Sequence, residues 1–117
     1  MRRKGLILLF VALLMAATAL QAQETRGQVL GRVTDPTGAV VVGVAVTGTN
    51  TATNVRTVAT TNHSGDYMLP FLIPGTYTVV VEMRGFKKFV QDGIGVQVND
   101  RATLNVSLEI RQASETV

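Results

Sequence analysis

Apolar and polar residues alternate with a period of two along most of this 117-residue chain, and beyond residue 22 no stretch repeats with the period of an amphipathic helix. The clearest stretch is 101–110, where every second residue is apolar: Ala102, Leu104, Val106, Leu108 and Ile110. A strand with this pattern buries one side and exposes the other to water. The alternation therefore predicts an all-β fold whose sheets each have one apolar face.

Turn signals divide the chain beyond residue 22 into seven expected strands. These are residues 28–34, 43–50, 55–61, 66–69, 75–83, 93–98 and 101–110. The sequence Asp-Pro-Thr-Gly at 35–38 is typical of a type I turn, Pro70 is expected to end the fourth strand, and 85–89 is expected to be a loop. Seven short strands in one small domain predict a seven-stranded antiparallel Greek-key β-sandwich.

Two tyrosines are expected in the core of this sandwich, because they stand at apolar positions of the alternation. Tyr77 shares a strand face with Val79, Val81 and Met83, and Tyr67 is expected to point inward as well. The strand at 55–61 has Thr and Arg where its neighbours have large apolar residues. A strand with such a weak apolar face is expected at the edge of a sheet.

The first 22 residues have the pattern of a secretory signal peptide. Arg2, Arg3 and Lys4 precede an uncharged apolar run from residue 6 to 20, and small residues follow. Cleavage is expected after Ala22, with a site after Ala19 as the alternative. A transmembrane anchor is the rival interpretation, but the run is shorter than the roughly 20 residues that a span needs. Outside the first four residues, acidic and basic groups are equal in number, so we expect no attraction for nucleic acid.

Composition excludes several kinds of site. The chain has no cysteine and one histidine, so it has no disulfide, no thiol nucleophile and no metal site that needs two imidazoles. The run His63-Ser64-x-Asp66 could suggest a hydrolase, but neighbouring turn residues point into water and do not form a triad. Four aspartates, Asp35, Asp66, Asp92 and Asp100, lack the spacing of a calcium loop. We therefore expect no enzyme activity, no metal and no cofactor.

Four segments carry a family resemblance. They are GRVTDPTGAV at 31–40, TNHSGDY at 61–67, LIPGTYTV at 72–79 and GFKKF at 85–89. Together, in order and with the right spacing, they resemble the carboxypeptidase regulatory-like domain over residues 27–110. The chain departs from this family at Val42-Gly43, where relatives often have Pro-Gly. The resemblance implies a transthyretin-like β-sandwich that accompanies catalytic units without being one.

The resemblance is closest to the domains at the amino terminus of TonB-dependent outer-membrane receptors. There, a signal peptide is followed by this domain and then by a plug and a barrel. The resemblance implies export to the periplasm or the outer membrane. Residues 111–117 show no pattern and are expected to be a disordered tail or a linker toward a plug. The sequence leaves open whether the domain acts alone or as part of a receptor.

The expected function is that of an interaction module. The edge strand at 55–61 could accept a strand of another protein, which is the mode of binding called β-augmentation. The alternative is a carbohydrate-binding module that uses the loop aromatics Phe71 and Phe89, since sugars stack on exposed rings. Those two rings could instead cap the open ends of the sandwich. Lys87 and Lys88 are too few to form a basic binding patch.

Overall fold

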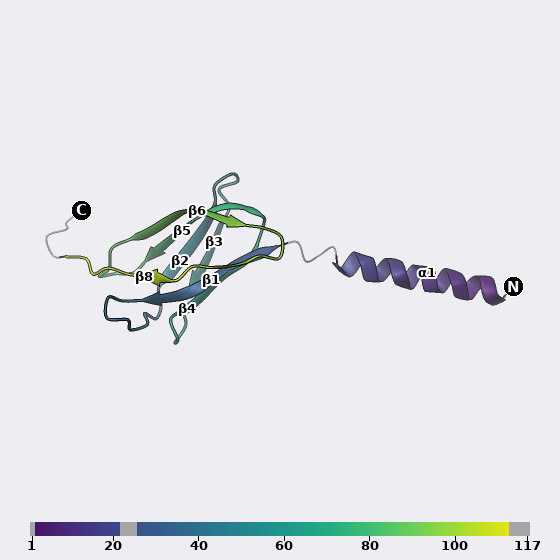
Figure 1. Cartoon of the computed structure of the whole chain (residues 1–117), viewed down its shortest axis with the longest axis horizontal. Coiled ribbons are helices and arrows are strands. Elements are labelled where there is room, and N and C mark those ends of the chain that lie inside the picture. The colour runs from purple at the N-terminus through teal and green to yellow at the C-terminus, as the bar shows by residue number, and fades with distance from the viewer. Residues whose placement is uncertain (1, 22–25, 113–117) are drawn as a thin grey trace.

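The computed structural model describes residues 2–21 and 26–112 as one helix and eight strands (Figure 1). The helix α1 covers Arg2–Gln21. The strands are β1 (Gly27–Thr34), β2 (Ala45–Asn50), β3 (Arg56–Thr60), β4 (Asp66–Leu72), β5 (Gly75–Glu82), β6 (Phe89–Val96), β7 (Arg101–Thr103) and β8 (Val106–Ser107). The expected cleavage site after Ala22 lies outside the described residues, as does the tail from residue 113.

The strands form two stacked sheets, which confirms the β-sandwich (Figure 1). The first sheet has the order β4-β1-β7, and β8 also pairs with β1 beyond the end of β7. The second sheet has the order β3-β2-β5-β6 and is antiparallel throughout. The predicted type I turn is closed by a 3.0 Å hydrogen bond from the Gly38 N–H to the Asp35 carbonyl. As predicted, β3 lies at a sheet edge.

The core lies between the two sheets and follows the alternation in the sequence. Among the residues whose burial is described, it contains thirteen apolar side chains that are 4% exposed or less: Val29, Val33, Val44, Val46, Tyr67, Leu69, Leu72, Tyr77, Val79, Val81, Val96, Val106 and Leu108. Both predicted core tyrosines are among them. The α1 side chains whose burial is described, residues 3–13, are all exposed and lie outside this core.

The apolar side chains of α1 that the structure describes lie in solvent. Large residues between Leu6 and Leu13 are 47–71% exposed, and they lie on all sides of the helix. An apolar surface of this kind lowers its free energy only in contact with another apolar phase. Among the described residues, no helix is both long and apolar enough to cross a membrane.

The prediction that Pro70 ends the fourth strand is wrong. β4 continues through Pro70 to Leu72, with a register shift between the pairs Val29–Leu69 and Gly27–Leu72. Phe71 adopts a φ of 55° within this β-bulge. β4 is an edge strand, so a residue without an N–H costs no hydrogen bond on its unpaired side, and the bulge absorbs the irregularity.

The sixth strand also differs from the prediction. β6 begins at Phe89, within the expected loop, and ends at Val96. Its register against β5 shifts between the pairs formed by Tyr77 and Val79, where Gly93 has a φ of 72°. The bulge interrupts the two-residue alternation, so the apolar pattern at 94–98 revealed only the second half of the strand.

The last expected strand, 101–110, is divided into β7, β8 and an isolated pairing of Ile110 with Phe86. This division gives eight strands where seven were expected. Moreover, β7 and β8 run parallel to β1, not antiparallel. The division occurs at Leu104, whose backbone passes so close over Gly31 that the regular ladder stops there.

Candidate functional site

The strand β3 has a regular, unpaired backbone edge. In an antiparallel ladder, alternate residues point their N–H and C=O groups toward the same neighbour. The Thr61 N–H donates to the Val44 carbonyl at 3.0 Å, and the Val55 carbonyl accepts from the Asn50 N–H at 3.0 Å. The odd-numbered residues therefore face β2, and the backbone groups of Arg56, Val58 and Thr60 face away from the sheet. The β2–β3 ladder has no register shift, so this edge is regular.

The other edge strand on this side of the molecule, β4, is largely closed to pairing. The Asn62 N–H donates to the Asp66 carbonyl, and the Asp66 N–H donates to the Asn62 Oδ1 atom, both at 3.0 Å. Pro70 has no N–H, and the bulge at Phe71 bends the strand. Of the positions on the outer edge of β4, only Met68 keeps a regular backbone that is free to pair.

The two remaining edges are irregular. β6 carries the bulge at Gly93, and the edge formed by β7 and β8 is interrupted at Leu104. Bulges and short strands are the usual means by which proteins protect sheet edges from pairing with other chains. Within the described residues, β3 is thus the only edge strand that has neither a bulge, nor a proline, nor a break.

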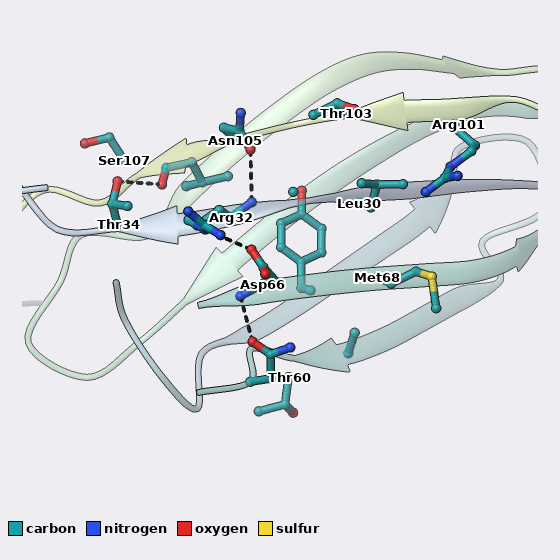
Figure 2. A pocket seen from close by; sticks show the side chains of 15 residues that line it. Leu30, Arg32, Thr34, Thr60, Asp66, Met68, Arg101, Thr103, Asn105 and Ser107 are labelled. Carbon is teal, nitrogen blue, oxygen red and sulfur yellow. Dashed lines mark hydrogen bonds and ion pairs between the residues drawn. The ribbon is translucent and has the colours of Figure 1, made fainter. Parts of the chain in front are cut away.

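An open groove of about 870 Å³ lies beside this edge (Figure 2). Its floor is the outer face of the first sheet, and its wall includes Ala59 and Thr60 of β3. Side chains from β1, β4 and the segment 101–107 project into it: Leu30, Arg32, Asp66, Met68, Arg101 and Asn105. Sequence reasoning did not group these residues, because they come from strands far apart in the chain and only the pairing of β1 with both neighbours brings them together.

Arg32 is the centre of the polar part of the groove. Its Nε atom donates to the Asp66 Oδ1 atom at 2.9 Å, and its backbone N–H donates to the Asn105 Oδ1 atom at 3.0 Å (Figure 2). The hydrogen bond with Asp66, and then the charge of that carboxylate, raise the pKa of Arg32. Both side chains are about half exposed, so solvent screens the pair and it contributes little to stability.

Tyr67 lies buried under the floor of the groove and holds the backbone of Leu104 in place. Its buried ring lies beside Gly31, its partner in the register, and its hydroxyl donates to the Leu104 carbonyl at 2.6 Å. Burial raises the pKa of the Tyr67 hydroxyl to about 12. The hydroxyl stays protonated at neutral pH, so this hydrogen bond holds the break between β7 and β8 in place.

The lining of the groove offers polar groups for hydrogen bonds and includes no histidine. Its hydroxyl groups, which belong to Thr34, Thr103 and Ser107 among others, have no imidazole beside them in the lining. His63 and Ser64 are exposed neighbours in the turn before β4, where Ser64 donates its backbone N–H to Asn62. Asp66, which completes the run that suggested a hydrolase, is paired with Arg32.

The four aspartates considered for calcium lie in separate places. Asp35 accepts bonds within its own turn, and the hydroxyl of Thr37 is the largest cause of its lowered pKa. Asp92 accepts from the Thr78 hydroxyl at 2.9 Å, and Asp100 accepts from the Gln97 N–H at 3.3 Å. Residues 2–21 and 26–112 hold no group of three acidic or histidine side chains that could bind a metal ion together.

The structure does not bring Phe71 and Phe89 together. Phe71 is 75% exposed next to Leu72, which pairs with Gly27 at the amino-terminal end of β1. Phe89 is partly buried against the core and pairs with Val81, six residues along β5 from the end that adjoins Gly27. Six strand residues span about 20 Å, so the two rings cannot form one platform.

Comparison with known proteins agrees with this architecture. The model of the carboxypeptidase regulatory-like domain family matches residues 28–109, which is most of the chain. The chain matches no curated protein in sequence.

Three solved structures illustrate the range of proteins that share the fold. The Bacillus anthracis TIE protein is 22% identical with a TM-score of 0.63, over 74% of this chain and 17% of that one. A putative carbohydrate binding protein from Bacteroides uniformis is 19% identical with a TM-score of 0.58, over 72% and 41%. The catechol 1,2 dioxygenase of Acinetobacter radioresistens is 13% identical with a TM-score of 0.60, over 82% and 55%. The chain therefore spans about half or less of each of these structures, and at such low identity the likeness concerns the fold alone.

Proposed function

The chain belongs to the carboxypeptidase regulatory-like domain family, and from this membership we propose that it is an exported, non-enzymatic interaction module. Its docking surface is the free edge of β3. The observation that carries this proposal is the regularity of that edge, since the other three edges are bent, interrupted or occupied. By resemblance, the module is an accessory domain of the TonB-dependent receptor type, located in the periplasm or at the outer membrane.

Export is supported by the amino-terminal segment. Arg2, Arg3 and Lys4 precede the uncharged apolar residues of α1, and residues 3–13, whose burial is described, are all exposed. A segment that is removed after export should not be part of the folded core, and the exposure of residues 3–13 agrees with this expectation. Amino-terminal sequencing of the secreted chain tests the proposal, with Gln23 as the expected first residue.

The absence of catalysis is supported by the arrangement of the reactive side chains. The single histidine lies in an exposed turn beside Ser64, and Asp66, the carboxylate of the groove, accepts a hydrogen bond from Arg32. The dioxygenase likeness brings no activity with it, because it concerns the fold. Turnover of ester or peptide substrates that disappears in a His63→Ala variant would contradict this part of the proposal.

Docking at β3 is tested by blocking the edge. Val58 is 65% exposed in the middle of β3, and Val90 is 49% exposed on β6 at the opposite edge of the same sheet. We expect Val58→Lys to abolish capture of a partner from periplasmic extract, while the matched Val90→Lys variant retains it. Amide hydrogen exchange of Arg56, Val58 and Thr60 should slow in the complex. A partner that binds both variants equally would show that β3 is not the docking edge.

Carbohydrate binding through Phe71 is the second candidate function. Phe71 is held at a φ of 55°, a conformation that is unfavourable for a bulky residue, and this backbone keeps the ring 75% exposed. Such an arrangement is suited to stacking against a sugar. Retardation of the wild-type chain in polysaccharide affinity gels, lost in Phe71→Ala and retained in Phe89→Ala, would favour this function over docking.

A further inference from the structure

The free edge of β3 is complementary to itself, and we propose that the strand it accepts is β3 of a second copy of this chain. The inference rests on the proposed docking function of β3 and specifies the partner. The proposal follows from the spacing of the three residues whose backbone groups face away from the sheet. These are Arg56, Val58 and Thr60, which are spaced evenly about Val58.

Antiparallel pairing about a twofold axis at Val58 uses every free position. In this register Val58 lies opposite its own counterpart, and Arg56 lies opposite Thr60 of the second copy. Each such pair exchanges an N–H and a C=O in both directions, because outward-facing residues form the hydrogen-bonded pairs of the new ladder. A shift to any neighbouring register leaves at least one free position unpaired on each chain. The self-pairing therefore selects one register.

The side chains fit this register. On the outer face the two Val58 side chains, each 65% exposed alone, shield one another from water. The two Arg56 side chains lie four residues apart along the ladder, or about 13 Å. At this distance salt screens most of the repulsion between their charges. On the inner face the contacting residues are the small Thr57 and Ala59. The inward-pointing charge that many edge strands use against self-association is absent here.

The size of the edge determines how strong the association can be. A ladder of five residues per copy buries less surface than the roughly 1,200 Å² of a standard stable interface. The dimer is therefore weak and concentration-dependent, and it becomes significant where copies are held close together. A test must therefore show which residues of the two copies lie opposite one another, as well as measure the mass of the complex.

Cysteine trapping does this, since the natural chain has no cysteine and a single introduced thiol has no competitor. In the proposed register the Cα atoms of the two Val58 residues are about 5.5 Å apart, which is within disulfide range. The Arg56→Cys variant is the matched control, because its thiols are separated by more than 7 Å and cannot be bridged. With the chain beginning at Gln23, mild oxidation should link the Val58→Cys variant at least tenfold faster than Arg56→Cys. Equal rates would overturn the proposal.

Sedimentation equilibrium supplies an independent measurement. The apparent mass of the wild-type chain should rise toward twice the monomer value with concentration, whereas Val58→Pro and Val58→Lys should remain monomeric with unchanged circular dichroism. Val58→Pro removes the central N–H, and Val58→Lys places two cations at the axis, so the lysine variant carries the test if the proline variant misfolds. A wild-type chain that stays monomeric at every concentration would refute self-pairing. If that monomer still loses a periplasmic partner in Val58→Lys, the docking function stands and only the second copy is wrong.

Discussion

Replacing Gly31 with alanine should destabilise the sandwich much more than its small size suggests. A methyl group at this position would overlap the carbonyl oxygen of Leu104, lie 2.6 Å from the carbonyl carbon, and lie 3.2 Å from the Tyr67 ring. The atoms of Leu104 belong to the backbone, so they cannot rotate away as a flexible side chain would. The segment between β7 and β8 must therefore move outward.

The expected cost combines steric strain with lost hydrogen bonds. Overpacking a well-packed site costs about 1–3 kcal/mol. Moving Leu104 weakens two bonds, its N–H to the Leu30 carbonyl at 2.8 Å and its carbonyl to the Tyr67 hydroxyl at 2.6 Å. Each is worth about 0.5–1.5 kcal/mol, and the lower entropy of unfolded alanine offsets about 0.4–1 kcal/mol. The free energy of unfolding should therefore fall by about 2–4 kcal/mol, which lowers the Tm by about 10–25 °C in a domain of this size.

Urea unfolding followed by circular dichroism and tyrosine fluorescence measures this difference. Gly95→Ala is the matched control, because Gly95 also lies in a strand, needs no positive φ, and has no heavy atom within 4 Å of its would-be methyl group. Its free energy of unfolding should change by less than about 0.5 kcal/mol. If Gly31→Ala costs no more than Gly95→Ala, the close approach of Leu104 to β1 is wrong, and so is the explanation of the break between β7 and β8.

Four further predictions concern side chains of the sandwich other than Gly31. Tyr67→Phe should lower the free energy of unfolding by about 1 kcal/mol, since the Leu104 carbonyl loses its donor. Because burial raises the Tyr67 pKa to about 12, the wild-type chain should lose stability in urea titrations as the pH rises from about 10 through 12, and Tyr67→Phe should lack this loss. Thr61→Val should cost about 1–3 kcal/mol in thermal melts, because the buried hydroxyl bonds two backbone groups, whereas the exposed Thr60→Val should be neutral. Phe71→Gly should leave the Tm unchanged or raise it, since glycine tolerates the positive φ at this exposed site, and a clear loss would show that the Phe71 ring packs against the domain.

The sequence was sufficient to predict the sandwich because the alternation of side chains directly records which face of each strand is buried. Val79, Val81 and Tyr77 are spaced two residues apart and all three are buried in the core. The same reasoning placed Tyr67 inside and β3 at an edge. These predictions depend only on the strand period, which local sequence determines.

The predictions that failed depend on which strands become neighbours. Pro70 ends a strand only if its missing N–H would have been paired, and the position of β4 at an edge removes that condition. Phe89 begins β6 because Val81 pairs with it across a bulge that no two-residue pattern reveals. Likewise, the even alternation of 101–110 does not reveal the contact of Leu104 with Gly31, which is 73 residues away in the sequence. Long-range register is a property of the assembled sheets, so local pattern could not supply it.

The candidate docking edge of β3 also depends partly on local sequence and partly on how the strands pair. The sequence alone shows that β3 has a weak apolar face. It does not show that β3 is the one regular edge in the described residues, because this depends on the irregularities of the other three edges. Asn62 and Pro70 close β4, Gly93 bends β6, and Leu104 interrupts the fourth edge. An unprotected edge is a liability for an isolated domain, because it can pair with any extended chain. The contrast between three edges that are closed, bent or interrupted and one that is regular is what the proposed docking of a partner strand at β3 requires.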